Sequence, residues 1–575
     1  MNDKTKIADV AGYLPAGAVE MGGVMGKRLN RSIENRVKTI NYRHLVDPFR
    51  QRNEIDGMWR CEFWGKNVYG AIMSWRATQD SDLKILIAAT VKDLISTQPS
   101  DGGISSYPPE FAGQGWDIWG RKYVMLALAK YWLEIERDDA VVHALIAHTD
   151  CLMRQVGPDG SDILACGMHD GMAASSILEP VLLVYRITGE PRYLDYAQWI
   201  VSRGGSQQHD IFQAAARGVP PRYIGNGKAY EMMSCFEGLA ELYRITGQDE
   251  YLQSLRTLWQ SIAEREILIT GVGGSRDPWG EFWGDGHFSQ FKKDSEYIGE
   301  TCVTSTWITF SLQLLRLTGD CRIADEIEKS YYNGLAGAMR HDGHWWMHLN
   351  PSPLNGLGFK QPAFDQIPGF GEDCCAAQGP KALAFFPAAM AMSDRTGGLF
   401  VNFFEPAKIT FDDAAAMLEI GGNYPYSGTI PMRLSLKRDA EFTLHIRIPG
   451  WCAEPELKVN GKTVPTTAGT YAELRRRWHH GDQLELTLPM PIRTIPAFDA
   501  SPRFALMRGP LLLVQESRVG KVNVPFQPVG GAEVEAPDGI EFAWRFADGM
   551  TVCDYASAGN TFDSLIKLCV WMPLA

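Results

Sequence analysis

A phrase that recurs at predicted helix ends constrains the fold of this chain more than any other feature. A tyrosine or leucine, an arginine, an aliphatic residue, a threonine and a glycine follow one another at residues 185–189, 243–247 and 315–319. Glycine readily takes the left-handed conformation that ends a helix. Each phrase therefore predicts a helix that ends at its glycine, followed by a polar turn that starts the next helix.

The distance between these phrases indicates how the helices assemble. Successive phrases lie 58 and 72 residues apart, which leaves room for a helical hairpin and a loop of variable length. Hairpins of this kind bury their apolar faces only by stacking on one another, in an open solenoid or a closed ring. The variable spacing and the long loops rich in glycine and tryptophan favour a closed α/α toroid, with the open solenoid as the alternative.

The hydrophobic period changes to two after about residue 395. Apolar and polar residues alternate at 442–448 and 484–488, and Asn460-Gly461 lies between two short β-prone segments, as in a tight hairpin. Short strands with turns rich in proline and glycine predict one or two β-sandwich units. We therefore expect an N-terminal segment at 1–20 that pairs with the C-terminal β domain, a helical barrel at 21–395, and β-sandwiches at 396–498 and 499–575.

Composition and charge exclude several classes of protein. The chain has 575 residues, of which 45% are hydrophobic, and 56 basic against 68 acidic residues give a net charge of −12. This composition excludes a disordered chain, and the acidic balance argues against nucleic-acid or anionic-membrane binding. Residues 7–11 are too short and interrupted for a signal-peptide core, and no apolar run is long enough to cross a membrane, so we expect a cytoplasmic protein.

Cysteines provide the strongest local sign of chemistry. Eleven are spread along the chain, which argues against a disulfide framework. The segments Glu300-Thr301-Cys302 and Cys374-Cys375 together offer three thiols and a carboxylate, a ligand set that suits tetrahedral zinc. Adjacent cysteines lack the usual two-residue spacer, so the spacing alone leaves open that these are unrelated buried thiols.

A second candidate is the segment 279–288, which contains Glu281 among tryptophan and phenylalanine residues. A carboxyl group surrounded by aromatic rings loses solvation, and its pKa then rises toward the range that suits a general acid. The alternative is a packed loop whose glutamate points to solvent. For His341, His344 and His348 we prefer a place at a pocket rim or in the core over metal binding, because a proline-rich segment follows them.

These residues resemble glycoside hydrolase family 127, the former domain of unknown function 1680, which is typified by β-L-arabinofuranosidases. The resemblance covers nearly the whole chain and implies an (α/α)6 barrel followed by β-sandwich, jelly-roll-like domains. It implies that Glu300, Cys302, Cys374 and Cys375 bind Zn²⁺, that Cys374 is the nucleophile, and that Glu281 is the general acid/base. The implied reaction is retaining hydrolysis with sulfur in place of the usual carboxylate nucleophile.

The chain departs from the family where the sugar binds. Family members hold the sugar with histidines, and the corresponding positions fall near Gly120, Ala174 and Lys228. Residues 376–380 also replace the family's Pro-Pro-Asn sequence. A rebuilt sugar pocket is therefore expected, and its candidate substrate-binding residues are Trp64, Trp116, Asp117, Arg121, Lys228, Trp283 and His348.

We therefore expect a zinc-dependent retaining glycoside hydrolase that acts on small glycosides or plant-type oligosaccharides, including β-L-arabinofuranosides through an altered pocket. The expected partner is a small carbohydrate, and a homodimer is compatible with the sequence. Two alternatives stay open. One is an α/α-barrel sugar epimerase or polysaccharide lyase, which would not need the cysteine pair, and the other is a non-catalytic carbohydrate-binding protein with structural zinc.

Overall fold

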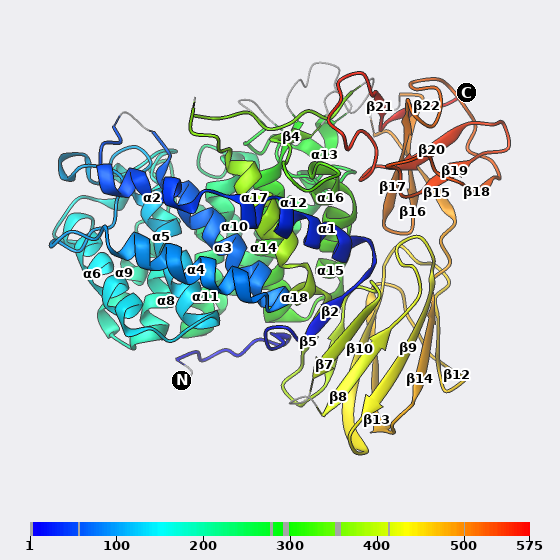
Figure 1. Ribbon diagram of the computed structural model, residues 1–575, viewed down its shortest axis with the longest axis horizontal. Helices are drawn as coiled ribbons and strands as arrows, with labels where there is room; N and C mark the ends of the chain where they lie inside the picture. The colour runs from blue at the N-terminus through cyan, green and yellow to red at the C-terminus, as the bar shows by residue number, and fades with distance from the viewer. Residues whose placement is uncertain are drawn as a thin grey trace.

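The computed structural model describes residues 4–55, 58–275, 280–290, 298–350, 358–367, 369–411, 415–498 and 501–575. A large helical part lies beside two β-rich parts, which follow it in the chain (Figure 1). The helical N-terminal domain and β-rich C-terminal domains confirm the predicted fold class.

Six nearly fully buried helices form the inner wall of the helical part. Each contacts the next along the chain, and the last packs back against the first, so the ring is closed. This closure distinguishes a barrel from the solenoid alternative. The inner helices are α3 (Cys61–Thr78), α5 (Asp117–Glu134), α8 (Leu178–Thr188), α11 (Ala229–Thr246), α14 (Thr301–Thr318) and α17 (Cys374–Ala384).

A second layer of helices covers this ring, each with one buried and one exposed face. Its members alternate with the inner helices along the chain, which gives the (α/α)6 arrangement. The outer helices are α1 (Gly23–Asn35), α4 (Ser81–Ile95), α6 (Asp139–Gln155), α9 (Pro191–Ser202), α12 (Asp249–Arg265) and α15 (Cys321–Lys329). Shorter helices in the connections are α2 (Tyr42–Gln51), α7 (Met172–Ser175), α10 (Ile211–Ala216), α13 (Gly286–Ser289), α16 (Ala336–Ala338) and α18 (Phe386–Met390).

The recurring threonine–glycine phrases end α8, α11 and α14, as predicted. Gly189, Gly247 and Gly319 follow these helices with φ angles of 76°, 69° and 63°. An L-residue with a side chain is strained in this left-handed region, whereas glycine is not. The three glycines therefore fix where the chain leaves the inner ring for the outer layer.

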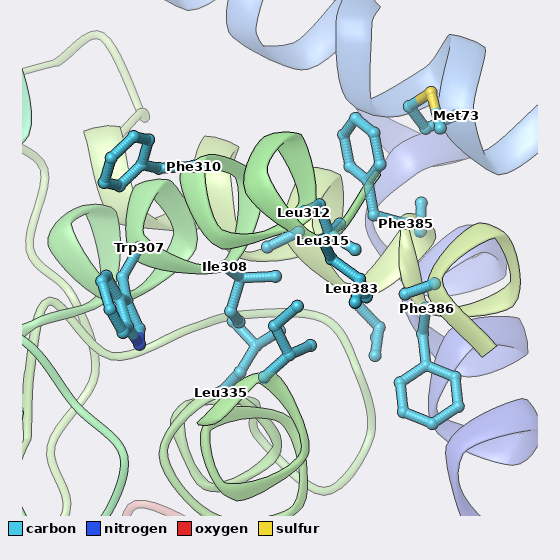
Figure 2. Packing of buried hydrophobic residues seen from close by; sticks show 14 of the residues in the cluster. Met73, Trp307, Ile308, Phe310, Leu312, Leu315, Leu335, Leu383, Phe385 and Phe386 are labelled. Carbon is cyan, nitrogen blue, oxygen red and sulfur yellow. The ribbon is translucent and has the colours of Figure 1, made fainter. Parts of the chain in front are cut away.

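Large apolar side chains fill the space between neighbouring elements of the barrel. Figure 2 shows side chains from α14 facing those near the end of α17 and on α3. Burying one such side chain stabilises the fold by about 1.5–3 kcal/mol. The residues shown include Met73, Trp307, Ile308, Phe310, Leu312, Leu315, Leu335, Leu383, Phe385 and Phe386.

The first β unit consists of two sheets. The predicted hairpin at Asn460-Gly461 is confirmed, since β11 and β12 pair on either side of it. One sheet has the order β1 (Gly12–Tyr13), β5 (Ala391–Ser393), β6 (Leu399–Val401), β10 (Ala440–Ile448) and β13 (Thr470–Trp478). The other has the order β12 (Lys462–Val464), β11 (Glu456–Val459), β14 (Gln483–Thr487), β9 (Thr429–Leu436), β8 (Ala416–Ile420), β7 (Ala407–Phe411) and β2 (Val19–Met21).

The N-terminal segment thus adds strands to the first β unit, β1 beside β5 and β2 beside β7. The C-terminal unit, by contrast, starts at Ile492 and forms one sheet within the described residues, where we expected a second sandwich from residue 499. Its strands are β15 (Ile492–Pro496), β16 (Arg503–Arg508), β17 (Leu511–Glu516), β18 (Ala532–Val534), β19 (Ala543–Arg545), β20 (Thr551–Asp554), β21 (Leu568–Cys569) and β22 (Met572–Pro573).

The extended chain before β1 covers one end of the barrel. The backbone N–H groups of Lys6 and Val10 donate to the carbonyls of Arg244 and Arg316 near the C-terminal ends of α11 and α14. The Asp9 carboxylate lies 2.7 Å from Arg244 Nε and 2.5 Å from Arg316 Nη2. The N-terminal segment therefore closes this end with backbone hydrogen bonds and ion pairs.

No helix among the described residues is long and apolar enough to cross a membrane.

Candidate active site

The first turns of the inner helices line a cavity of about 300 Å³ at the other end of the barrel. Partial positive charge at helix N-termini favours anionic groups such as carboxylates and thiolates. The residues that line the cavity are Trp59, Glu62, Lys66, Trp116, Trp119, Lys228, Tyr230, Glu231, Glu281, Glu300, His348, Phe364, Gln366 and Cys374.

A buried group of sulfur, oxygen and nitrogen atoms lies beside this cavity. Ligand atoms of Glu300, His348, Cys374 and Cys375 lie within 4.8 Å of one another, so the group could hold a metal ion. Cys302 is behind it, with Sγ 3.4 Å from Cys375 Sγ. The fold therefore brings together all four residues of the predicted zinc set and adds His348.

The spacing within this group matches tetrahedral coordination. With metal–sulfur bonds of about 2.3 Å and a metal–oxygen bond of about 2.0 Å, two sulfurs lie about 3.8 Å apart and a sulfur and an oxygen about 3.5 Å apart. The Sγ atoms of Cys374 and Cys375 are 3.8 Å apart. Glu300 Oε1 is 3.7 Å from the first and 3.6 Å from the second. These three ligand atoms are therefore spaced as around a tetrahedral metal ion, whereas Cys302 Sγ, 3.4 Å from Cys375 Sγ, is closer than two sulfurs bound to one zinc.

Two local structures bring the ligand atoms together. The strands β3 (Ile298–Glu300) and β4 (Leu349–Asn350) pair, and the Thr301 N–H donates to the His348 carbonyl over 3.0 Å, which brings Glu300 beside His348. Asp373 caps α17 by accepting hydrogen bonds from the N–H groups of Cys375 and Ala376. The cap thus fixes the first turn, which carries both cysteines.

Asp373, which the sequence analysis missed, also orients His348. Its Oδ2 lies 2.8 Å from His348 Nδ1, while His348 Nε2 lies 3.9 Å from Glu300 Oε1. Burial lowers the pKa of His348, but the charge and hydrogen bond of Asp373, together with the charges of Cys374 and Glu281, more than reverse this and raise it to about 9. A carboxylate that holds the far nitrogen of a histidine beside a metal group is a common supporting contact in metal sites.

The group carries an excess of acidic side chains that burial disfavours in their charged forms. Burial raises the pKa of Glu300 well above its ordinary value, and the Glu281 charge raises it further. Burial also raises the pKa of the Cys375 thiol. Glu300 Oε2 and His348 Nε2 have no hydrogen-bond partner among the described residues. A divalent cation would satisfy this set.

Glu281 is held at the cavity by its backbone. The N–H of Ala229 donates to the Glu281 carbonyl over 2.9 Å, and the Trp283 N–H donates to the Gly227 carbonyl over 2.8 Å. These bonds place the Glu281 carboxylate against the Lys228 ammonium, which donates a hydrogen bond to Oε2. Glu281 therefore faces the cavity rather than solvent alone.

Comparisons with known proteins identify the family. A model of the glycoside hydrolase family 127 (GH127) β-L-arabinofuranosidase catalytic domain matches residues 21–388, and one of the GH127 middle domain matches residues 398–490. The chain belongs to the GH127 family. It is therefore a glycoside hydrolase.

Individual GH127 relatives agree with this assignment. A non-reducing end β-L-arabinofuranosidase of Bifidobacterium longum subsp. longum is 25% identical in an alignment 531 residues long, which covers 83% of this chain and 76% of that protein. The crystal structure of a GH127 β-L-arabinofuranosidase from Geobacillus stearothermophilus T6 has a TM-score of 0.75 at 20% identity, covering 97% of this chain and all of that one. A second GH127 β-arabinofuranosidase structure has a TM-score of 0.79 at 20% identity, covering 100% of this chain and 99% of that one.

The predicted substrate-binding residues of this GH127 chain divide into two sets. Trp116, Lys228 and His348 line the cavity. The placement of four others is corrected, because they are buried and do not line this cavity: Trp64, Asp117, Arg121 and Trp283. Trp279, in the aromatic segment around Glu281, lies outside the described residues.

Each corrected residue outside the Glu281 loop has a partner in the wall. The Trp64 indole N–H donates to Thr90 Oγ1 on α4 over 3.0 Å. Asp117 and Arg121 form an i,i+4 ion pair of 2.9 Å on α5, and Arg121 Nη1 donates to Gln155 on α6. This charged pair within one helix turn therefore joins an inner to an outer helix and does not line the cavity.

Two of the positions that depart from the family are filled by packing. A β-carbon at Gly120 would lie 2.4 Å from Cys61 Cβ, because α3 and α5 approach closely there. Ala174 is fully buried. A histidine at either position would need a different arrangement of the wall.

The sequence analysis missed several cavity residues, namely Trp59, Glu62, Lys66, Trp119, Tyr230, Glu231, Phe364 and Gln366. Glu62 and Lys66 form a buried i,i+4 ion pair of 2.7 Å on α3, and the Trp119 indole N–H donates to Glu62. A signal was present, since charged residues occur near the starts of several strongly apolar helices, where only functional or paired charges are expected.

Proposed function

We propose that this GH127 protein is a zinc-dependent retaining glycoside hydrolase with Cys374 as nucleophile and Glu281 as general acid/base, acting on small glycosides with β-L-arabinofuranosides as the first class to test. One observation carries the assignment of the nucleophile. Of the three clustered thiols, Cys374 alone lines the cavity and is 8% exposed, whereas Cys302 and Cys375 are 0% exposed.

The proposed zinc ligands are Glu300, Cys302, Cys374 and Cys375. The mixed sulfur and oxygen donors, their burial and the tetrahedral spacing of Glu300, Cys374 and Cys375 support zinc over harder ions. When bound, Zn²⁺ would keep the cysteine sulfurs deprotonated. His348, held by Asp373, lies at the edge of this group and at the cavity wall.

The proposed reaction uses two groups of this chain in two steps. The Cys374 sulfur attacks the anomeric carbon while Glu281 donates its proton to the glycosidic oxygen, so a carbon–sulfur bond forms as the carbon–oxygen bond breaks. Glu281 then removes a proton from water, the water oxygen attacks the same carbon, and the sulfur leaves. Two inversions give a product that retains the anomeric configuration.

We also propose that the protein acts in the cytoplasm. All eleven cysteines are unpaired and buried, which suits a reducing compartment. The homodimer stays a prediction.

The first experiment measures metal and activity together. Zinc content is determined by plasma mass spectrometry, and a panel of 4-nitrophenyl glycosides that includes the β-L-arabinofuranoside is assayed before and after chelation. We expect about one zinc per chain, as a four-ligand site implies, and loss of turnover on chelation that added Zn²⁺ restores. Full activity in zinc-free protein would contradict the proposal.

The second experiment tests the two-step mechanism. In Glu281→Ala, a 4-nitrophenyl leaving group needs little protonation, so the second step becomes limiting. We expect added azide to restore turnover and to yield a glycosyl azide of the same anomeric configuration as the substrate. An inverted azide product, or no rescue together with full wild-type activity of Cys374→Ala, would reject retention through sulfur.

A further inference from the structure

One carboxylate in the cavity has no role in the proposed mechanism. Glu231 lies in the first turn of α11, is 2% exposed and lines the same cavity as Cys374 and Glu281. Its Oε2 has no hydrogen-bond partner among the described residues. A buried carboxylate oxygen without a partner is costly, so it persists where a ligand supplies the missing hydrogen bond.

The other oxygen of Glu231 fixes its place relative to the reacting groups. Oε1 lies 3.8 Å from Lys228 Nζ and 3.9 Å from His169 Nε2. Lys228 donates to Glu281 as well, so one ammonium group bridges the proposed acid/base and Glu231. A sugar whose glycosidic oxygen meets Glu281 would therefore lie within reach of Glu231.

The charges around this place restrict what the sugar can carry. The two cavity lysines are already paired, Lys66 with Glu62 and Lys228 with Glu281. The free Oε2 of Glu231 can only accept hydrogen bonds. A glycone with hydroxyl donors satisfies it, whereas a carboxylate on the glycone would face a second buried negative charge.

We propose that Glu231 is a specificity-determining residue that accepts a hydrogen bond from the C2 hydroxyl of a neutral glycone. This inference rests on the proposed function for the position of the anomeric carbon. It names the substrate class as glycosides of uncharged sugars with a free C2 hydroxyl. Lys228 occurs in place of a family histidine. Its ammonium group contacts both Glu231 and Glu281 and thereby fixes their relative position.

Equilibrium binding tests this role without requiring hydrolysis. Tryptophan fluorescence is followed in zinc-loaded protein, since Trp59, Trp116 and Trp119 line the cavity. The probes are L-arabinose with its C2-deoxy counterpart 2-deoxy-L-ribose, D-galactose with 2-deoxy-D-galactose, and D-galacturonate. The proteins are the unmodified chain, Glu231→Gln, and Glu237→Gln, which carries the same substitution six residues further along α11, outside this cavity.

For the neutral sugar that binds more tightly, we expect loss of the C2 hydroxyl to raise Kd about tenfold or more in the unmodified protein, as for a hydrogen bond to a charged group. In Glu231→Gln this penalty shrinks to about threefold or less, because one partner of the pair is already altered. In the unmodified protein we expect D-galacturonate to bind more weakly than D-galactose. In Glu231→Gln the difference between the two Kd values should be smaller. Glu237→Gln behaves like the unmodified protein.

Equal deoxy penalties in the unmodified protein and Glu231→Gln would overturn the proposal, as would tighter binding of D-galacturonate than of D-galactose or no binding of either neutral sugar. The hydrolase proposal fails separately. Binding that depends on Glu231, combined with no release of 4-nitrophenol from any glycoside, would reject hydrolysis and leave the sugar-binding role of Glu231 intact.

Discussion

The two ends of the barrel differ in how their charged and polar side chains are paired. At the cavity end, Glu231 Oε2, Glu300 Oε2 and His348 Nε2 are buried without hydrogen-bond partners among the described residues. At the other end, Asp9 is bonded to both Arg244 and Arg316. The groups near the N-termini of α11 and α14 thus include buried carboxylate oxygens without a partner. Near their C-termini the Asp9 carboxylate is paired with two arginines, of which Arg316 keeps one unpartnered nitrogen, Nε, among the described residues.

We infer that the inner helices serve function at one end and stability at the other. An 18-residue helix such as α14 spans about 27 Å. At its N-terminus the positive end of the helix dipole favours anionic groups such as the proposed metal ligands Glu300 and Cys302. Near its C-terminus the N-terminal segment supplies backbone donors and an aspartate that hold the helices together. Changes at the two ends should therefore affect different measurements.

The largest expected effect is at the cavity end. Cys374→Ser should lower kcat on the preferred glycoside by about 10⁴-fold or more, because a neutral hydroxyl replaces the nucleophilic sulfur. Cys374 is also a proposed zinc ligand, so zinc content and the thermal unfolding midpoint are measured together with kcat, to separate loss of the nucleophile from loss of the metal. Cys235→Ser, which alters a buried thiol on α11 that does not line the cavity, should keep its turnover. Equal losses of kcat in Cys374→Ser and Cys235→Ser would contradict the assignment of catalysis to the cavity end.

The next effect is at the closed end. Asp9→Ala leaves the buried Arg244 and the half-buried Arg316 without their shared carboxylate, so the free energy of unfolding should fall by about 3 kcal/mol in chemical denaturation. The turnover of the protein that stays folded should match that of the unmodified chain. A loss of kcat in Asp9→Ala at a temperature where the protein is fully folded would show that the two ends are coupled.

The closed architecture could be predicted because it rests on local rules. The glycines after α8, α11 and α14 need a left-handed backbone, and the alternating residues of β10 need one buried face, so each motif indicates its own structure. The metal group was reached by resemblance and by residue type. The contact between Glu300 and Cys375 joins chain segments 75 residues apart, and no local pattern specifies such a contact.

The sugar pocket was less predictable for a physical reason. Trp64 and Glu62 are two residues apart on α3, yet the first bonds to the outer helix and the second faces the cavity. In a helix buried on all sides, apolar spacing does not indicate which face points inward. Charge pairing does not indicate the inward face either. The Glu62–Lys66 and Asp117–Arg121 pairs have the same spacing in the sequence, but only the first pair lines the cavity.

A pH measurement sharpens the contrast at the closed end. Burial raises the pKa of Asp9, but the charges of Arg244 and Arg316 outweigh it and hold that pKa below its usual value. The ion pairs therefore contribute their full stability above about pH 4, and this contribution is lost as the pH falls further through the folded-state pKa. In Asp9→Asn, denaturant midpoints should fall less steeply with acidification than in the unmodified protein. Identical slopes would mean that other carboxylates dominate.

The smallest effect concerns the glycine that ends α11. Gly247 has a φ of 69°, and a β-carbon there would lie 3.4 Å from Ile7 of the N-terminal segment, so the contact itself is tolerable. Gly247→Ala should then lower the free energy of unfolding by about 1 kcal/mol through backbone strain, with kcat unchanged. Gly461→Ala, in the hairpin of the first β unit with φ of 76° and no atom within 4 Å, is the matched control. If both variants lose the same stability, strain at the turn explains the loss. A larger loss in Gly247→Ala would show that the N-terminal segment presses on the barrel end and that its packing, as well as the Asp9 ion pairs, holds that end closed.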